Sequence, residues 1–160
     1  VPLRWIAHRH LSPDELAAWP DLRPIRIPRD HFGPGLPNRA LRVSPQHRIR
    51  LEGWWVELLF GAEQVLVPAR HLLGGGITQP DDGRRVDYYH LLFDRHEILE
   101  TSGLFSESFH PAAYGLSLLD APQIAEVVRL FPGLARDACS YGPTARTCLR
   151  SWETALMVAC

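Results

Sequence analysis

Residues 41–51 read Leu41-Arg42-Val43-Ser44-Pro45-Gln46-His47-Arg48-Ile49-Arg50-Leu51. The stretch after the proline alternates polar and apolar residues, which is typical of a half-buried strand, and the Ser-Pro pair before it indicates a turn. A hydroxyl stands three residues before an imidazole in this turn. At the end of a strand, Ser44 and His47 can lie around one reacting amide. Taken alone, such a tetrapeptide is more often a turn with a surface histidine.

Further strands are predicted on the C-terminal side of this stretch. The apolar runs at residues 54–60 and 64–67 each predict a strand, and residues 88–99 hold two more apolar runs that an Asp-Arg pair separates. Fourteen prolines and twelve glycines fall mostly between the short runs, which is typical of an all-β domain. Residues 21–40 carry six prolines and glycines and predict a long irregular connection.

Two segments carry the start signals of helices. Ser12 precedes Pro13 and Glu15, which is the pattern of a capping box. Asp120 precedes Pro122 in the same way, and apolar side chains then recur at helical spacing up to residue 131. Apolar residues at 145, 148, 149, 152 and 156 predict a second helix by the same spacing. We therefore expect a mainly β domain over residues 1–118 and a C-terminal α-helical extension over residues 119–160.

The composition disfavours several classes of protein. The chain has 160 residues, 46% of them hydrophobic and 22% charged, which suits one globular domain. All 17 basic residues are arginines scattered among 18 acids, and the net charge of −1 differs from the basic excess of a nucleic-acid binder. No apolar run approaches the roughly 18 residues of a membrane span. We therefore expect no nucleic-acid partner and no membrane partner.

Histidine is the unusual residue of this chain, since five of its eight copies lie between residues 47 and 110. Imidazole transfers protons near neutral pH and is a common metal ligand. His90 and His96 are six residues apart, so a continuous strand would put them on one face with Asp94 between them. A break at Asp94-Arg95 would instead give one hydrogen-bonded turn. The spacings of Cys139, Cys148 and Cys160 match no zinc knuckle.

Three stretches in order resemble conserved blocks of Hedgehog/intein (Hint) domains. Residues 41–49 resemble the block whose core is Thr/Ser-x-x-His. The run Val65-Leu-Val-Pro-Ala-Arg-His-Leu-Leu-Gly-Gly is similar to the strand and turn written Val-x-Ala-x-x-Leu-x-x-Gly-Asp. The run Tyr89-His-Leu-Leu-Phe-Asp-Arg-His-Glu-Ile-Leu, followed by Ser102-Gly103, is similar to the late block. The resemblance covers residues 3 to 115, and the late block looks most like the bacterial Hint-domain subfamily.

This resemblance implies a Hint-type β fold and self-processing. In Hint domains the first residue is a Cys or Ser that attacks the carbonyl of the preceding peptide bond and forms a thioester or an ester. His47 would be the general acid that protonates the leaving nitrogen, and Ser44 would orient the amide. His90 stands where late blocks often carry Asp, and it would exchange a proton or make a structural hydrogen bond. His96 aligns with the late-block His, which completes the set of four candidate catalytic residues.

Two departures from the family pattern shape the expected activity. No Cys or Ser stands at the front of the chain, so we expect the opening block with the nucleophile to be missing and this chain to be inactive by itself. Glu107-Ser108 stands where inteins place His-Asn, and an Asn is required to cut the C-terminal junction. We therefore expect Hedgehog-like activation of an N-terminal bond rather than splicing. The partner is then the chain's own N-terminal flanking polypeptide in cis, and no cofactor is needed.

Two other functions fit the same residues. His47, His90, Asp94 and His96 suit a metal-binding module or a metal-dependent hydrolase. A β-rich interaction module that has kept a Hint scaffold without activity is the other alternative. The resemblance favours a bacterial protein and leaves its location, cytoplasmic or secreted, open.

Overall fold

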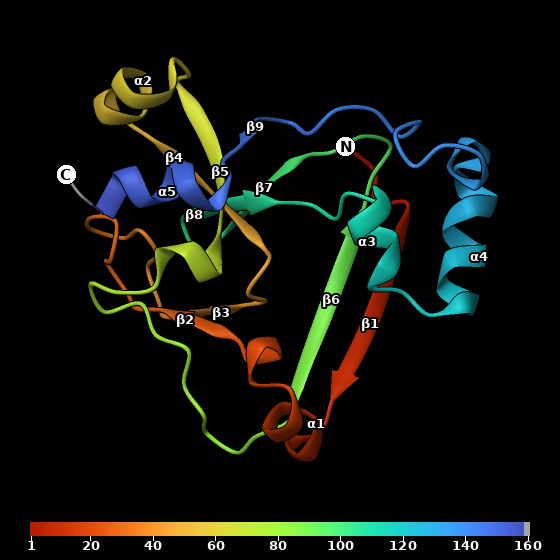
Figure 1. The fold of residues 1–160 in the computed structure, drawn as a ribbon, viewed down its shortest axis with the longest axis horizontal. Helices are drawn as coiled ribbons and strands as arrows, with labels where there is room; N and C mark the ends of the chain where they lie inside the picture. Colours follow the sequence, from red (N-terminus) through yellow and green to blue (C-terminus); the bar gives the residue numbers. More distant parts are fainter. Residues whose placement is uncertain (159–160) are drawn as a thin grey trace. The chain divides into compact units, whose positions relative to one another are not determined.

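The computed structural model describes residues 1–158, so that Cys160 lies outside the described part of the chain. Figure 1 shows the order of the helices and strands. The chain forms two units that interleave along the sequence. The larger unit contains residues 9–88, 98–107 and those from 146 onward, and the smaller unit contains residues 1–8, 89–97 and 108–145. Each unit has a hydrophobic core of its own.

A five-stranded sheet forms the framework of the larger unit. In spatial order its strands are β7 (Ile98–Thr101), β8 (Leu104–Glu107), β4 (Arg48–Glu52), β5 (Gln64–Pro68) and β9 (Thr147–Cys148). β4 is antiparallel to both β5 and β8, whereas β9 runs parallel to β5. The alternation that predicts β4 is visible in its burial, since Ile49 and Leu51 belong to the core while Glu52 is exposed.

The segment before this sheet contains both a confirmed prediction and a wrong one. The capping box of α1 (Pro13–Ala18) is confirmed, because Ser12 accepts the Glu15 N–H at 3.2 Å and Glu15 accepts the Ser12 N–H at 2.8 Å. A short 3-10 helix, η1 (Pro20–Leu22), follows. The irregular connection predicted for residues 21–40 is wrong at β2 (Ile25–Ile27), which pairs antiparallel with β3 (Leu41–Val43). Both isoleucines of β2 are fully buried, and this burial stabilises a strand among prolines.

The strand predicted over residues 54–60 is wrong, because these residues form helix α2 (Trp54–Phe60). A short, mostly apolar run of this length does not distinguish a strand from a helix. The helix ends at Gly61, whose φ of 62° is left-handed and whose N–H donates to the Glu57 carbonyl at 2.9 Å. Val56 is fully buried on one side of α2, whereas Trp54 is 77% exposed on the other.

The helix predicted from residue 145 to 156 is wrong in its first half. Residues 147 and 148 form β9 instead, and α5 begins only at Ser151 (Ser151–Val158). Leu149 N–H extends the contact with β5 by donating to the Leu66 carbonyl at 2.9 Å. Strand pairing in the sheet therefore overrides the helical spacing of residues 145–149. A further 3-10 helix, η2 (Ala69–Leu72), follows β5.

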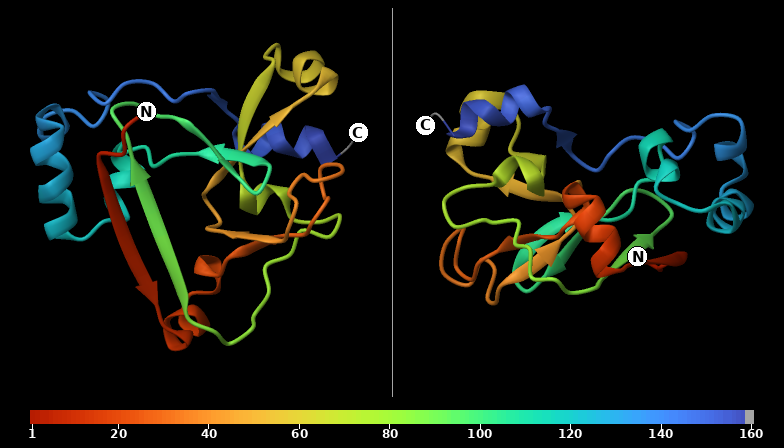
Figure 2. Two further views of the ribbon diagram at one scale, coloured as in Figure 1. Left: turned by 180° about the vertical axis from the view of Figure 1, so that it is seen from behind. Right: turned by 60° about the horizontal axis from the view of Figure 1, so that its bottom comes forward.

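The smaller unit is built on parts of a two-stranded ribbon and on helices. Strands β1 (Trp5–Leu11) and β6 (Val86–Leu92) pair and run in opposite directions (Figures 1 and 2), and each continues into the larger unit. The helices are α3 (Ala113–Ser117), α4 (Ala121–Leu130) and the 3-10 helix η3 (Pro132–Ala135). The predicted start of α4 is confirmed by a capping box between Asp120 and Gln123.

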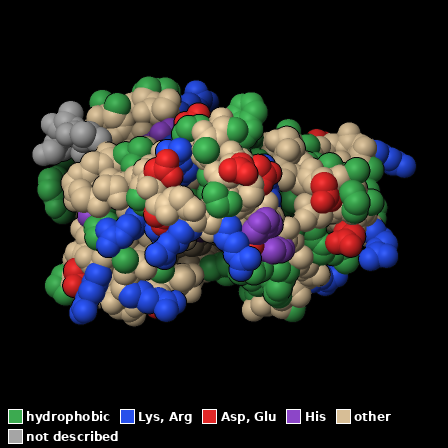
Figure 3. Space-filling model, turned by 90° about the horizontal axis from the view of Figure 1, so that it is seen from below, with side chains coloured by type: hydrophobic (Ala, Val, Ile, Leu, Met, Phe, Trp, Pro, Cys, Tyr) green, Lys and Arg blue, Asp and Glu red, His purple; other side chains and the backbone are tan. Residues whose placement is uncertain are grey.

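Strands thus lie mostly before residue 108 and the longer helices after residue 112, which confirms the predicted mainly β fold with C-terminal helices. The division into domains at residue 118 stays a prediction. On the face shown in Figure 3, arginine side chains lie singly or in small groups with carboxylates between them. The ion pairs of the chain include Arg23–Asp81 at 2.8 Å and Arg42–Asp82.

Candidate functional site

Ser44 and His47 close one tight turn between β3 and β4 in the larger unit. The His47 N–H donates to the Ser44 carbonyl oxygen at 3.0 Å. Pro45 is buried at the second position of the turn, where its fixed φ favours this geometry. The Cα atoms at the two ends of a β-turn lie within about 7 Å of one another. The predicted hydroxyl and imidazole therefore belong to one small, half-buried site.

The η2 segment fixes this turn through its backbone and one side chain. Ala69 N–H donates to the His47 carbonyl at 3.0 Å, and Arg70 N–H donates to the Pro45 carbonyl at 2.9 Å. With its amide oxygen turned toward Arg70, Gln46 accepts hydrogen bonds from the guanidinium at 2.6 and 3.3 Å. Two sequence motifs that lie twenty residues apart are thereby joined, and the backbone on both sides of His47 is held.

His71 stabilises the position of Arg70 and is itself perturbed by it. Arg70 Nε donates to His71 Nε2 at 3.2 Å, so that the ring proton resides on Nδ1. His71 Nδ1 is buried and has no hydrogen-bond partner among the described residues. Burial, and after it the positive charge of Arg70, lowers the pKa of His71 below its ordinary value of 6.5.

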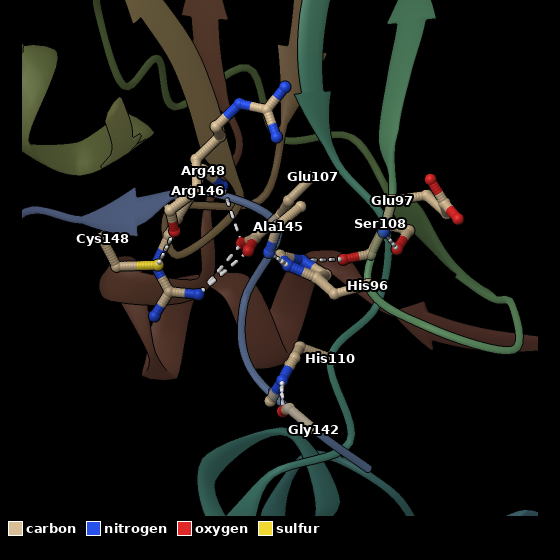
Figure 4. Close-up of polar contacts among 10 residues, drawn as sticks. All are labelled: Arg48, His96, Glu97, Glu107, Ser108, His110, Gly142, Ala145, Arg146 and Cys148. Atoms are coloured by element: carbon tan, nitrogen blue, oxygen red, sulfur yellow. Dashed lines mark hydrogen bonds and ion pairs between the residues drawn. The ribbon is translucent and has the colours of Figure 1, made fainter. Parts of the chain in front are cut away.

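Next to His47 along the chain, Arg48 is held by a buried carboxylate (Figure 4). Glu107 Oε1 accepts the Arg48 backbone N–H at 2.9 Å, and its two oxygens accept from the guanidinium at 3.3 and 3.0 Å. Only 9% of the Glu107 side chain is exposed. The sequence places Glu107 only at the position of an intein histidine and does not predict its pairing with Arg48. The available signal was a carboxylate at the end of a mostly buried run, because a buried acid needs a partner.

His90 and His96 belong to the smaller unit, and no single strand joins them. β6 ends at Leu92 and residues 94–95 form a bend, so the structure has the break at Asp94-Arg95 and not the continuous strand. The His90 ring lies 4.8 Å from the Phe109 ring, tilted by 47°. Phe109 in turn belongs to the core of this unit.

His96 is buried, with 3% of its surface exposed, and both of its ring nitrogens face backbone groups (Figure 4). Nε2 lies 3.1 Å from the Ser108 carbonyl oxygen, and the Ala145 N–H donates to Nδ1 at 2.9 Å. The neighbouring His110 lies edge-on to His96, with ring centroids 5.0 Å apart. His110 Nε2 donates to the Gly142 carbonyl oxygen at 3.0 Å.

Tyr141 completes this histidine cluster from the other side of His110. Their rings lie edge-on with centroids 5.3 Å apart, and the Tyr141 hydroxyl donates to the Phe93 carbonyl at 2.9 Å. Burial, with smaller contributions from the negative charges of Glu97 and Asp94, raises the pKa of Tyr141 to about 12. The hydroxyl therefore stays protonated at neutral pH and remains a donor.

No three or more His, Cys, Asp or Glu side chains in residues 1–158 are grouped so that they could hold a metal ion. The alternative of a metal-binding module accordingly gains no support from the structure. Cys139 is a free, exposed thiol. Within the same described range, no helix combines the length and the apolar character needed to cross a membrane.

Comparison with known proteins identifies one family. The family model of the Hint domain matches residues 1–113, which include Ser44, His47, His90 and His96. The match ends where the helical part of the chain begins. No curated protein and no solved structure gives a significant match to the chain.

Proposed function

The chain belongs to the Hint domain family, and from this premise we propose that its full-length form activates a peptide bond on the N-terminal side of the domain by an acyl shift. The thiol or hydroxyl of the residue that follows the scissile carbonyl attacks that carbonyl. The carbon–nitrogen bond breaks, a carbon–sulfur or carbon–oxygen bond forms, and the proton of the nucleophile ends on the released amine. The reaction is Hedgehog-like autoproteolysis of a flanking segment in cis.

His47 is the proposed general acid, and Ser44 is the proposed orienting hydroxyl. An amide nitrogen leaves as an amine only when it is protonated, and a positioned imidazole contributes typically 10²–10⁴-fold to such a step. The single observation that carries the proposal is the closed turn at residues 44–47, tied by backbone hydrogen bonds to Ala69 and Arg70. A turn held in this way reduces the entropy that the reaction must otherwise lose when it orders its catalytic groups.

The residues at the end of β8 support N-terminal activation rather than splicing. Cleavage of a C-terminal junction by cyclisation requires an asparagine, and Glu107 and Ser108 stand at the corresponding positions. Glu107 accepts hydrogen bonds from Arg48, and the Ser108 Oγ accepts the Glu97 N–H at 2.9 Å. Neither side chain can form the cyclic imide by which asparagine breaks a peptide bond.

The test is self-cleavage of the whole polypeptide encoded by the open reading frame that contains residues 1–160. Purified protein is incubated with and without hydroxylamine, and products are followed by mass spectrometry. We expect cleavage that hydroxylamine accelerates, a loss of about 10²-fold or more in His47→Ala, and a smaller loss in Ser44→Ala. His31→Ala changes a half-buried histidine outside the turn and serves as the matched control. Wild-type rates in His47→Ala would contradict the proposal.

A second experiment tests the need for a nucleophile. Val1 carries neither thiol nor hydroxyl, so residues 1–160 placed behind an N-terminal fusion partner should release nothing at that junction. Release of the fusion partner that thiols accelerate would show that another group of the chain attacks the bond. The proposed chemistry would then be wrong.

A further inference from the structure

Residues 141–145 contact His96 and His110, although they lie beyond the part of the chain that the family model matches. In Figure 4 this segment approaches His96 at Ala145 and His110 at Gly142. Tyr141 anchors the beginning of the segment through its hydrogen bond to the Phe93 carbonyl, and only 8% of its surface is exposed. All of these residues belong to the smaller unit.

The partners of His96 define which of its nitrogens carries the proton. A carbonyl oxygen only accepts, so Nε2, 3.1 Å from the Ser108 oxygen, bears the hydrogen. A backbone N–H only donates, so Nδ1, 2.9 Å from the Ala145 nitrogen, is bare. Both nitrogens of a ring that is 3% exposed are thus bound to backbone groups. A general acid instead needs a ring N–H directed at the substrate.

Ser108, whose carbonyl oxygen binds His96, makes two further hydrogen bonds with Glu97. Ser108 N–H donates to the Glu97 carbonyl at 2.8 Å, and the Ser108 Oγ accepts the Glu97 N–H at 2.9 Å. Together with the bond from His96, three hydrogen bonds hold residue 108, and two of them are made with the residue directly after His96. Residues 96–97 therefore fix the position of Ser108 through these hydrogen bonds.

We propose that residues 141–145 form a strap that fixes the ring of His96, and that His96 is a positioning residue rather than a proton donor. The strap supplies the N–H at residue 145 that keeps Nδ1 bare, and the ring in turn directs its Nε2–H at Ser108. The role in self-processing rests on the proposed function, whereas the state of the ring does not. Residues 141–145, which lie beyond the family match, then contribute to the function of the domain.

Nitrogen NMR of the His96 ring in residues 1–160 tests the strap independently of any activity. Ala145→Pro removes the backbone N–H, and Ala145→Gly keeps it and serves as the matched control. We expect a bare Nδ1 and a protonated Nε2 in the wild type and in Ala145→Gly, and altered ring resonances in Ala145→Pro. A protonated Nδ1 in the wild type, or unchanged ring resonances in a folded Ala145→Pro, would overturn the strap. If Ala145→Pro does not fold, the protonation state of the His96 ring nitrogens in the wild type decides whether the strap exists.

Self-cleavage of the whole polypeptide tests the role of His96. His96→Gln keeps a side-chain N–H for Ser108 but cannot exchange a proton, and His47→Gln makes the same change at the proposed general acid. We expect His47→Gln to lose about 10²-fold or more and His96→Gln to lose clearly less, because the glutamine keeps the hydrogen bond to Ser108. Equal losses would overturn the positioning role. Absence of cleavage in the wild type would instead contradict the proposed function, and the ring resonances would still decide the strap.

Discussion

His71 shows how a local contact sets the charge state of a single residue. Its Nε2 accepts from Arg70, and its buried Nδ1 lacks a partner among the described residues. Protonation of Nε2 would bring two donors face to face and would place a positive charge beside the guanidinium. Both consequences disfavour the charged ring, in agreement with the lowered pKa.

We predict that the pKa of His71, measured by NMR titration, lies below 6.5 in the folded chain. Desolvation is the larger cause and Arg70 the smaller, so Arg70→Gln should restore less than half of the shift. Above pH 6.5 the ring is neutral in both the folded and the unfolded state. As the pH falls through 6.5, the unfolded chain binds the proton first, and the free energy of unfolding decreases.

The control for this prediction is His71→Gln, which has no titrating group at this position. Urea unfolding of this variant between pH 7.5 and 5 should show a shallower decrease in stability than the wild type. A His71 pKa at or above 6.5, or equal slopes for the two proteins, would contradict the burial argument.

At this scale, sequence spacing predicts local pairs and misses distant ones. Ser44 and His47 are three residues apart, so turn geometry alone brings them together. Glu107 and Arg48 are 59 residues apart and meet because β8 pairs with β4, with Ile49 opposite Ser106. No spacing rule reports which two strands will be neighbours. The catalytic roles assigned to His90 and His96 stay predictions.

Among the elements, the β7–β8 hairpin depends on an unusual backbone at its tip. Ser102 and Gly103 both have positive φ, at 56° and 83°. Two such residues suit a two-residue hairpin turn, because its twist matches that of the strands. The Gly103 position is also crowded, since a Cβ there would lie 2.6 Å from the Gly35 carbonyl oxygen.

We predict that Gly103→Ala destabilises the chain by about 2–4 kcal/mol, because a left-handed φ and a backbone clash act together. Gly83→Ala is the matched control. Gly83 has a φ of 62° with nothing within 4 Å of the added Cβ, so only the conformational cost of about 1–2 kcal/mol applies. Chemical unfolding of the two variants measures the difference. Equal losses would show that the Gly35 contact relaxes without cost.

Three elements that the sequence predicts correctly carry a clear local signal. α1 and α4 have capping boxes, and β4 alternates along its whole length. The run at residues 54–60 has no alternation, and β9 consists of two residues whose strand character comes only from pairing with β5. Both errors therefore reflect tertiary contacts that local patterns do not encode.

At the scale of the whole molecule, the interleaving of the two units could not be predicted from a linear sequence. The predicted helical extension, residues 119–160, contributes to both cores. Leu119, Val127, Leu134 and Tyr141 are buried in the smaller unit, and Leu149 is buried in the larger one.

We therefore predict that residues 1–118 alone do not fold to a cooperative structure. Each buried apolar side chain contributes about 1.5–3 kcal/mol, so the five that are lost match the total stability of about 5–15 kcal/mol of a typical domain. Loss of β9 also exposes the edge of β5. Thermal unfolding and amide exchange should show a broad, unprotected species, and addition of a fragment spanning residues 119–160 should restore protection. Cooperative unfolding of residues 1–118 at the melting temperature of the full chain would show instead that the helical extension packs without supporting either core.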